Sequence, residues 1–516
     1  MAESSGSPPG SAPPMPPLTG FPLGMTTIFL ALATFMNILD TTITNVSIPT
    51  IAGNLSVSPQ QGTWTITSYV VSTAIVVPLT GWLALRFGEV RLFTTCTLLF
   101  TLTSVMCGMA PTFEALVLLR SLQGAVAGPM IPLSQSLLLR NYPEEKRGLA
   151  LAFWSMTTTV APILGPILGG YITDNLGWPW IFYINVPIGF LSAWGVWTML
   201  RKRESKTLKK PVDLTGLALL FIGVGSLQLM LDQGHDLDWF DSPFILGLAV
   251  VAVVGIVFFV VWELKEKHPV VDLTLFARRN YAVGTIAIAM GYTVFFAGVV
   301  IFPLWLQTQM DYTATWAGLA TAPMGIMMVI LAPLVGKNMH KFDLRALACF
   351  SFIVFAFTNY WQGSLNAGVD YWNLILPRFF QGMGMAFFFV PLTTISLAGL
   401  PHDRIASAAG LTNFIRILGG GFGASLAVTV WDQRTEYHHS YLAESISPFN
   451  QVWTEAYADM AAQGMGLETA LGMVERTIVR QSAMLAANDI FLASSATFIL
   501  LAGFILLARP PVGKKA

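Results

Sequence analysis

Long apolar runs recur along almost the whole of this chain. Runs such as 243–263 return at short intervals between residues 24 and 508. A helix of about 20 residues, rising 1.5 Å per residue, crosses a hydrocarbon core of ~30 Å. Composition agrees, because 54% of the residues are hydrophobic and 11% are charged, whereas a soluble domain has roughly 25% charged residues. The sequence therefore predicts an all-α polytopic membrane protein and excludes soluble enzymes and nucleic-acid-binding domains.

Fourteen spans are predicted when glycines, prolines and charge clusters are taken as boundaries. They cover residues 24–48, 62–83, 91–110, 113–137, 149–170, 178–200, 214–231, 243–263, 281–306, 316–336, 346–363, 372–395, 406–431 and 487–508. Of the 28 Lys and Arg residues, 22 lie in alternate connections. Because basic residues near span ends stay on the cytoplasmic side, both termini are predicted to be cytoplasmic.

An internal repeat divides the spans into two sets of six. Residues 119–124 (Leu-Arg-Ser-Leu-Gln-Gly) match 377–382 (Pro-Arg-Phe-Phe-Gln-Gly), and nearby Pro-Leu, Pro and Arg positions repeat at offsets of 257 to 259 residues. A second match pairs 63–91 with 315–345 in the same order. Two parallel repeats with a substrate path between them are typical of transporters. Spans seven and eight are then an inserted pair.

The predicted organisation follows from these boundaries. It comprises a disordered cytoplasmic tail (1–22), an N-terminal six-helix half (23–200), a linker with two inserted helices (201–280), a C-terminal half (281–510) with a long periplasmic loop at 432–486, and a tail (511–516). The 55-residue loop contains helix-like stretches near 451–463 and 467–486. Loops of this length are usually functional or partly disordered.

Asp40 is the only acidic residue deep inside a predicted span, and Arg120 in span four is expected at a similar depth. Charges inside a membrane are expensive and usually functional. Burial disfavours an ionised carboxylate and a nearby guanidinium favours it, so such a group can switch near neutral pH. We expect Asp40 to alternate between binding a proton and pairing with Arg120. A permanent structural ion pair is the alternative.

Further polar and aromatic side chains are candidates for lining a central substrate cavity. Gln123 and Gln381 lie one helical turn from Arg120 and Arg378 and could face the path, with interhelical hydrogen bonding as the alternative. The full candidate set is Asn37, Tyr69, Gln123, Trp154, Gln381, Phe388 and Asn413.

Several motifs resemble the fourteen-span drug:proton antiporters of the major facilitator superfamily, of the EmrB type. They are Leu39–Ile43 with Asn45 and Pro49, Gly81 with Arg86 and Gly88, Arg120 with Gln123 and Gly124, and the run 161–170, Ala-Pro-Ile-Leu-Gly-Pro-Ile-Leu-Gly-Gly. The resemblance covers residues 20 to 510 and is most specific in the run 161–170, which is similar to the motif that marks exporters.

This resemblance implies a role for each motif. Gly165, Pro166, Gly169 and Gly170 would form a conformational hinge, with ordinary tight helix packing as the alternative. Gly81, Arg86 and Gly88 would form a cytoplasmic gating loop. The family usually carries an Asp just before that Arg, whereas this chain has Leu85 there and Glu89 after Gly88, so Glu89 is expected to substitute.

The resemblance also implies function and partners. Hydrophobic drugs and toxic compounds would leave a bacterium through its inner membrane, driven by the proton gradient with no other cofactor. The long loop would dock an EmrA-type periplasmic adaptor that continues to a TolC-type outer-membrane channel, or else form a cap over the transporter. A proton-coupled importer or facilitator of small metabolites is the alternative, since the same fold serves both.

Other chemistry lacks a recognisable site. The sequence contains no HExxH, GxSxG or P-loop motif, so enzymatic function is not expected. His438 and His439 lack further ligands at metal spacing. The three cysteines fall inside predicted spans and are expected to act as small packing residues.

Overall fold

The computed structural model describes residues 16–208, 213–234, 237–267, 269–366, 368–401, 404–444, 446–447 and 449–509. Every regular element in these ranges is a helix, as lipid requires, because a helix satisfies its own backbone hydrogen bonds. Thirteen helices are long and apolar enough to cross a membrane, and a bent pair brings the number to fourteen. The predicted fold class is therefore confirmed. The predicted tails fall largely on residues 1–15 and 510–516, which lie outside the described ranges, and α1 begins at Gly20.

Six spans form the N-terminal half, and proline or glycine interrupts two of them. Pro78 lies in a short 3-10 turn between α3 and α4, and Gly128-Pro129 separates α6 from α7. The helices are α1 (Gly20–Asn54), the short α2 (Pro59–Gly62), α3 (Trp64–Val76) with α4 (Thr80–Phe87), α5 (Glu89–Gly108), α6 (Phe113–Ala127) with α7 (Met130–Asn141), α8 (Arg147–Leu176), and α9 (Trp180–Tyr183) with α10 (Asn185–Leu200).

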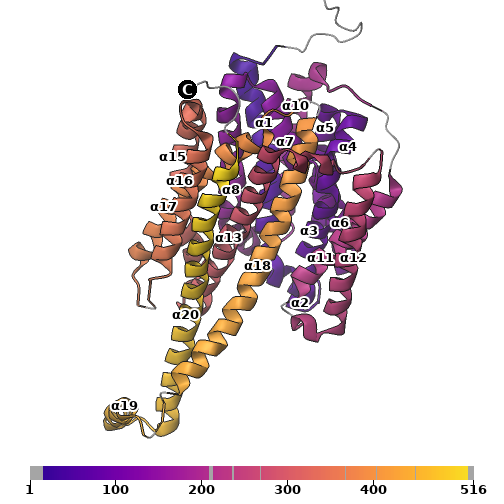
Figure 1. Cartoon of the computed structure of the whole chain (residues 1–516). Coiled ribbons are helices and arrows are strands. Elements are labelled where there is room, and N and C mark those ends of the chain that lie inside the picture. Colours follow the sequence, from indigo (N-terminus) through magenta and orange to yellow (C-terminus); the bar gives the residue numbers. More distant parts are fainter. Residues whose placement is uncertain are drawn as a thin grey trace, which may run out of the picture.

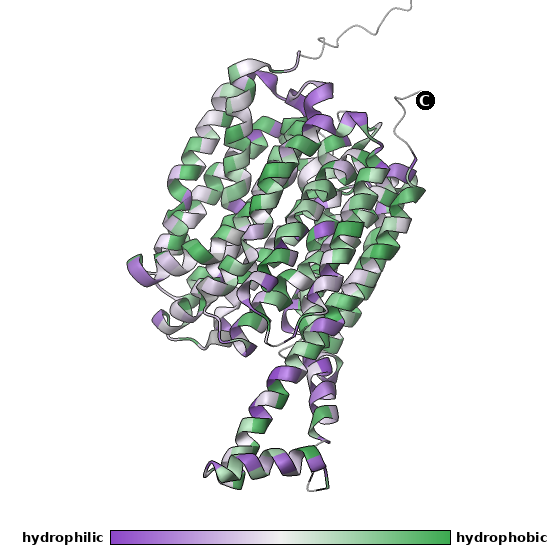
Figure 2. Cartoon of the chain, turned by 90° about the vertical axis from the view of Figure 1, so that its left-hand side faces the viewer, coloured by the Kyte–Doolittle hydropathy of each residue, from purple (hydrophilic) through white to green (hydrophobic). Residues whose placement is uncertain are grey.

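The remaining helices comprise the inserted pair, the C-terminal half and one short helix outside the spans. They are α11 (Leu214–Gln233) and α12 (Pro243–Lys265), then α13 (Arg279–Gln309), α14 (Ala314–Thr321) with α15 (Pro323–Asn338), α16 (Leu344–Gln362), α17 (Tyr371–Leu397), α18 (Ile405–Ala443), α19 (Gln451–Ala462) and α20 (Leu467–Phe504). Both described chain ends lie at the same end of the bundle (Figure 1), which we call the terminal end. Apolar residues dominate the bundle, and polar ones gather at its two ends (Figure 2).

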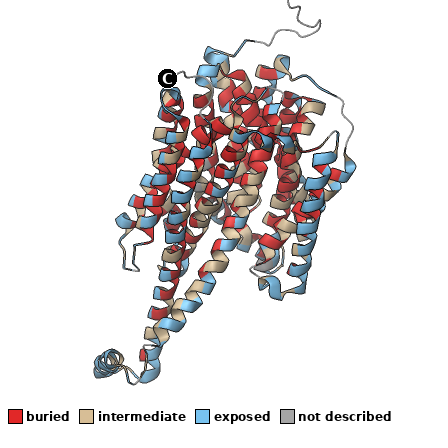
Figure 3. Ribbon diagram, viewed as in Figure 1, coloured by how far each residue is buried: buried red, intermediate tan, exposed pale blue. Residues whose placement is uncertain are grey.

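At the terminal end the two halves pack into one core. A single cluster of buried side chains contains residues of both halves, including Met130 and Trp154 of the first and Met328 and Phe389 of the second. Figure 3 shows this end as the most densely buried part of the bundle. The indole of Trp154 packs edge-on against the ring of Phe389, with centroids 6.1 Å apart. We call this contact between the halves the seam.

Small residues let the backbones meet at the seam. A side chain at Gly336 of α15 would collide with the carbonyl oxygen of Gly148 in α8, and one at Gly81 would collide with the backbone of Ser407 at the start of α18. Such close approach is typical of glycine at helix contacts in membranes. The terminal end is therefore closed.

Towards the opposite end each half has its own core. One cluster, with Leu39, Cys107 and Phe182, belongs to the N-terminal half, and another, with Phe302 and Trp305, belongs to the C-terminal half. The halves thus share one buried cluster at the terminal end and have separate clusters beyond it, where Gly318 of α14 still lies close to Ile167 of α8.

The inserted helices lie beside the junction of the halves. Leu220 and Val224 of α11 share a buried cluster with Ala74 of α3 and Leu411 of α18. The amide of Gln228 also lies close to Gly421 of α18. The pair therefore touches both halves without adding to the repeat.

Helices fill most of the segment 432–486, which we call the arm. The predicted end of span thirteen was wrong by about three turns, because α18 continues past residue 431 to Ala443. Charged residues end the apolar run there but not the helix, since α18 and α20 support each other through Arg434 and His438, which both bind Asp489 at 2.7 and 2.8 Å. The arm projects away from the bundle and carries α19 at its tip (Figure 1), so it does not cap the transporter.

Candidate functional site

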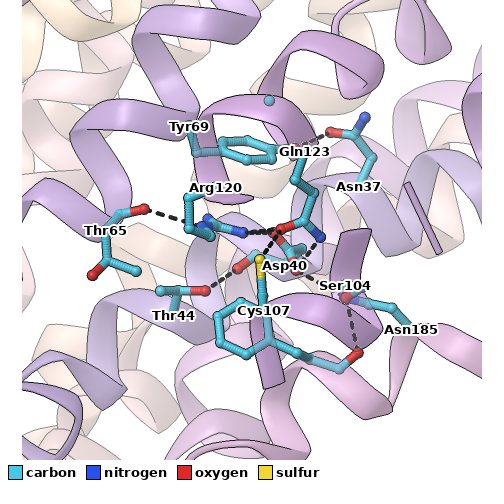
Figure 4. Close-up of polar contacts among 12 residues, drawn as sticks. Asn37, Asp40, Thr44, Thr65, Tyr69, Ser104, Cys107, Arg120, Gln123 and Asn185 are labelled. Atoms are coloured by element: carbon cyan, nitrogen blue, oxygen red, sulfur yellow. Dashed lines mark hydrogen bonds and ion pairs between the residues drawn. The ribbon is translucent and has the colours of Figure 1, made fainter. Parts of the chain in front are cut away.

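Asp40 and Arg120 form a buried ion pair inside the N-terminal half. Asp40 lies in the middle of α1 and Arg120 in α6. The Nη1 of Arg120 lies 2.5 Å from the Oδ2 of Asp40, and both side chains are completely enclosed. The expected common depth of these residues therefore agrees with a direct contact between them (Figure 4).

Two further side chains donate to the carboxylate. Asn185 of α10 donates its amide to Oδ1 of Asp40 at 2.8 Å, and Gln123 donates to the same oxygen at 3.4 Å. Asn185 also donates to the hydroxyl of Ser104 in α5 at 3.0 Å. Asp40 thus accepts hydrogen bonds from three side chains, and its network joins α1, α5, α6 and α10.

Arg120 is fixed by neutral partners as well. It donates from Nε to the carbonyl oxygen of Thr65 at 3.0 Å and from Nη1 to Oε1 of Gln123 at 2.7 Å. The ring of Tyr69 lies 4.3 Å from its guanidinium carbon, and that of Phe182 lies 5.5 Å away. Nη2 is buried without an acceptor in the described part of the chain.

This arrangement suits an ionised Asp40. A carboxylate only accepts hydrogen bonds, and the three side chains bonded to this one all donate to it. Adding a proton to Asp40 would cancel the negative charge that holds Arg120. It would also turn one carboxylate oxygen from a hydrogen-bond acceptor into a donor that faces other donors. A proton on Asp40 would therefore weaken the contacts that hold α1 to α6 and α10.

The C-terminal half repeats the arginine and the glutamine but not the acid. Arg378 donates from Nη1 to Oε1 of Gln381 at 2.8 Å, as Arg120 does to its glutamine. Its Nη2 donates to the carbonyl oxygen of Gly298 at 2.8 Å, and its guanidinium lies 3.9 Å from the ring of Phe302. Gly298 follows Asp40 in the sequence by the same number of residues as Arg378 follows Arg120, so the two positions are equivalent in the internal repeat. The second half therefore has a backbone carbonyl where the first has a carboxylate.

Close packing also repeats. A side chain at Gly124 would collide with the carbonyl oxygen of Tyr69, and one at Gly382 would collide with that of Met324. These glycines follow the two Arg and Gln pairs at the same spacing. The internal repeat seen in the sequence is thus present in the packing of α6 on α3 and of α17 on α15.

Most candidate cavity residues are buried and bonded. Gln123 and Gln381 accept hydrogen bonds from the arginines of their own helices, and Gln123 also donates to Asp40 of α1, which is an interhelical hydrogen bond. The hydroxyl of Tyr69 donates to Oδ1 of Asn37 at 3.2 Å, and Asn37 donates to the carbonyl oxygen of Ala127 at 3.0 Å. In this state these four side chains belong to the interior of their own halves.

The other three candidates divide between the seam and the second core. Trp154 and Asn413 lie at the seam, where the amide of Asn413 donates to Oε1 of Gln135 at 3.1 Å. Phe388 lies inside the C-terminal half among Phe352 and Phe355. Only the first two lie between the halves, and substrate contact stays a prediction for all of them.

The glycine-rich run of α8 coincides with a bend. The parts Glu144–Pro162 and Ile167–Leu176 meet at 48°. Side chains at Gly165 or Gly169 would collide with α1 at Thr42 or Ile43, whereas Gly170 faces open space. The side chain of Pro166 lies outside what the structure describes. The glycines Gly165 and Gly169 therefore pack against α1 of their own half. The same helix α8 meets the other half at Gly148 and Trp154, and at Ile167, which lies close to Gly318 of α14.

The predicted gating loop reaches both its own half and the other one. Gly81 touches α18, while Gly88 has a positive φ of 90°. Glu89 accepts from the hydroxyl of Ser136 at 3.0 Å and pairs with Arg140 at 3.3 Å, both in α7. Glu89 thus binds within the N-terminal half, and Arg86 lies over the ring of Trp82 at 5.6 Å.

Sequence reasoning missed Asn185, Ser104 and Glu204. Asn185 is a polar residue in the run Ile-Phe-Tyr-Ile-Asn-Val-Pro, which was a usable signal. Ser104 is one of many hydroxyl-bearing residues in the predicted spans, so the sequence gave no signal that singled it out. Glu204 follows the sixth span and caps α5, accepting from the backbone nitrogens of Val90 and Arg91 at 2.9 Å each. Among the described residues, no group of three or more His, Cys, Asp and Glu side chains could hold a metal ion.

Solved structures support the fold. The chain aligns with the human organic anion transporter MFSD10 at a TM-score of 0.57 and 12% identity, covering 94% of this chain and 100% of that one. A double-tryptophan mutant of XylE gives the same TM-score at 13% identity, covering 94% of this chain and 99% of that one.

Sequence relatives are much more similar. The multidrug export protein EmrB of Escherichia coli K12 is 51% identical over 498 residues, which is 96% of this chain and 97% of the relative. The fatty acid resistance protein FarB of Neisseria gonorrhoeae is 50% identical over 496 residues, covering 96% and 98%. The EmrB of Haemophilus influenzae is 49% identical over 504 residues, covering 98% and 99%. Residues 30–424 match the family model of the Major Facilitator Superfamily. The chain therefore belongs to the major facilitator superfamily and is a multi-pass bacterial inner-membrane protein of the EmrB type.

Proposed function

We propose that this transporter is a proton-coupled antiporter that exports hydrophobic drugs and other toxic compounds. The observation that carries the proposal is the enclosed pair of Asp40 and Arg120. Ionisable groups inside a membrane are rare and commonly mark proton or ion pathways. Two of the reported relatives bear the name multidrug export protein.

Protonation of Asp40 supplies the coupling. In the described state its ionised carboxylate ties α1 to α6 and α10 through Arg120 and Asn185. A bound proton weakens these ties and favours a different packing of the same helices. A ligand shifts the equilibrium between two states only by the difference in its affinity for them. A proton that binds more tightly to one packing therefore shifts the equilibrium between the two packings towards it, by a few kcal/mol.

The positive-inside rule assigns the terminal end to the cytoplasm. A structure whose halves share one core at that end and have separate cores beyond it is then closest to the outward-facing state. Substrate would leave to the periplasm from this state.

The arm is the proposed contact with a periplasmic adaptor of the EmrA type, leading to a TolC-type channel. It presents large apolar side chains to solvent, among them Tyr441, Phe449 and Val452, which are 67, 98 and 75% exposed. A hollow of about 290 Å³ between α18 and α20 is lined by Ile446, Leu471 and neighbours. Exposed apolar surface of this kind marks interaction sites.

Proton flux in vesicles tests the central claim. Inside-out vesicles containing the purified protein are loaded with a pH-sensitive dye and given an acid interior, and hydrophobic drugs are added outside. We expect drug-induced proton efflux in wild type and none in Asp40→Asn. Drug movement without protons would refute the proposal, and protons moving with the drug would favour an importer.

A shortened arm tests the partner. Replacing residues 444–466 by a Gly-Ser linker removes α19 and leaves the bundle intact. Vesicle antiport should persist, while drug resistance of cells that also express the adaptor should fall to that of cells without the transporter. Full resistance with the shortened arm would exclude the arm tip as a docking site.

A further inference from the structure

The inserted helices carry a buried carboxyl group that the proposed transport cycle does not use. Glu263 lies in the last turn of α12, at the terminal end of the bundle, where α11 begins and α12 ends (Figure 1). The residue is 3% exposed, and its Oε1 is enclosed without a hydrogen-bond partner. Its other oxygen, Oε2, accepts from the backbone nitrogen of Val271 at 3.2 Å. An enclosed carboxylate oxygen that no donor reaches is costly when the group is ionised.

A second carboxyl group lies beside the unpartnered oxygen. A side chain at Gly216 of α11 would collide with both Oδ2 of Asp213 and Oε1 of Glu263. The two acids are therefore neighbours across this glycine. Two carboxylates so placed repel each other when both are ionised, which favours a proton on one of them.

No cation offsets this repulsion among the described residues. Glu263 forms no ion pair there, and the next charged side chain of its own helix end that shares its helix face is another acid, Glu266. Lys265 and Lys267 are exposed to the surroundings of the helix end. The adjoining basic residues outside the described ranges are Lys209, Lys210 and His268.

The two acids differ in their surroundings, and the difference decides which one is ionised. Asp213 is the N-cap of α11, where its Oδ1 accepts from the backbone nitrogen of Gly216 at 2.9 Å and the helix dipole favours a negative charge. Its Oδ2 accepts from the indole nitrogen of Trp262 at 2.7 Å. Glu263 has a single donor and stands in the last turn of α12, where the dipole disfavours a negative charge. Asp213 is therefore the carboxylate of the pair.

We propose that Glu263 is a second proton-binding site of this transporter, which keeps its proton at neutral pH and shares it with Asp213. A protonated carboxyl group has one O–H donor and can still accept. Oε1 then donates towards Asp213 while Oε2 accepts from Val271, so the enclosed oxygen is no longer without a partner. The site lies in the inserted pair, outside the internal repeat, so it is independent of Asp40 and of the export proposal.

The proton on Glu263 stabilises a joint between the inserted pair and the C-terminal half. Val271 is buried in one cluster with Leu411 of α18. The next residue, Asp272, pairs with Arg404 at the start of α18 at 3.5 Å. Loss of the proton would place two negative charges side by side next to the bond with Val271. An alkaline pH at the terminal end should therefore loosen this joint.

Infrared spectroscopy of the full chain tests the site, because a protonated carboxyl group has a carbonyl stretch that a carboxylate lacks. The detergent must contain no ester groups. An ordinary glutamate is ionised above about pH 4.3, so we expect wild type at neutral pH to show this band and Glu263→Gln to lose it. Wild type should lose the band as the pH is raised to alkaline values. Asp213→Asn should lose it at a lower pH, since the neighbouring charge is gone.

Glu145→Gln is the matched control, because Glu145 is an exposed glutamate at the same end of the bundle, and it should keep the band. Identical spectra of wild type and Glu263→Gln at neutral pH would overturn the assignment. A band that persists in Glu263→Gln and vanishes in Asp213→Asn would place the proton on Asp213 and also overturn it. If size exclusion shows that Glu263→Gln is misfolded, the titration of Asp213→Asn decides, and a midpoint unchanged from wild type would refute the site.

The joint is tested with Val271→Cys in a chain whose three native cysteines are replaced by alanine. At alkaline pH its thiol should react several-fold faster with a maleimide than the same thiol in a chain that also carries Glu263→Gln. At neutral pH the two rates should agree. Both chains share the pH dependence of the thiol itself, so the comparison isolates Glu263. Equal rates at both pH values would overturn the joint.

Discussion

Removing the charges of Asp40 and Arg120 singly and together is the most direct test of the buried pair. The substitutions are Asp40→Asn, which keeps the shape of the side chain, Arg120→Gln, which is a shorter neutral replacement, and the double variant. Both side chains are completely enclosed. Removing one partner of a buried ion pair leaves the other as an uncompensated charge, which costs roughly 3–5 kcal/mol.

The structure shows what each single variant leaves behind. Asp40→Asn leaves Arg120 with two neutral acceptors, the amide of Gln123 and the carbonyl of Thr65. Arg120→Gln leaves the Asp40 carboxylate with the amides of Asn185 and Gln123. Neither supplies an opposite charge, so each single variant should lower the free energy of unfolding by about 3 kcal/mol or more.

The double variant is neutral again. It should be less destabilised than the sum of the single variants by about 2–3 kcal/mol, the size of coupling found for residues in one network. Denaturant unfolding in a mild detergent measures the stabilities, and the pH-sensitive dye measures drug-driven proton flux in vesicles. We expect the double variant to regain stability but not proton flux.

Two results would refute this reasoning. Additive losses of stability would mean that the two charges do not support each other. Proton-coupled export by Asp40→Asn would place the coupling group elsewhere, however stable the protein. If the double variant regains stability but shows no drug-driven proton flux, the pair has a role in proton coupling beyond that of a structural ion pair.

Three further substitutions test other parts of the structure. Gly336→Leu places a side chain against the backbone of α8 at the seam and should open the terminal end. We expect a cysteine introduced by Trp154→Cys to react about tenfold faster with a membrane-impermeant thiol reagent when Gly336→Leu is also present, because overpacking costs ~1–3 kcal/mol. Glu204→Ala removes the cap of α5 and should lower the free energy of unfolding by about 0.5–2 kcal/mol without changing the drug affinity. Gly124→Val and Gly382→Val collide with backbone carbonyls of their own halves and should each destabilise the protein by about 3 kcal/mol or more.

Gly247→Val is the control for these glycine substitutions, because a side chain there meets nothing within 4 Å. Unchanged cysteine reactivity in Gly336→Leu would contradict the closed seam. Normal stability of Gly124→Val alone would contradict the equivalence of the two repeats, and an affinity change in Glu204→Ala would give that residue a role beyond capping.

The sequence predicts the fold well because lipid leaves few choices. Backbone groups must be satisfied within each span, so apolar length, basic residues at span ends and one internal repeat were sufficient to place all fourteen helices. The end of span thirteen at residue 431 was wrong because hydropathy measures the membrane and not the helix. A charged segment such as 432–443 continues as helix when a partner helix supports it.

The candidate site could be predicted only in part. A lone Asp40 among apolar residues is conspicuous, and its pairing with Arg120 followed from a common depth. Asn185 and Ser104 complete the network through helices that only the folded chain brings together. Gln123 was harder, because a glutamine one turn from an arginine could face either the path or its neighbour, and three-dimensional packing decides between them.

The two halves have kept the same arginine, but only the first pairs it with an acid. Under the proposed antiport, a neutral drug that leaves in exchange for one proton moves one positive charge inward. Since one charge crossing 100 mV is worth about 2.3 kcal/mol, the limiting driving force for a neutral drug should grow by that amount per 100 mV. Inside-out vesicles with an interior-positive potassium diffusion potential measure this as steady-state accumulation of the drug at fixed pH gradient. Accumulation that does not respond to the potential would mean that no net charge moves in the exchange, which would contradict the coupling of one proton to one neutral drug.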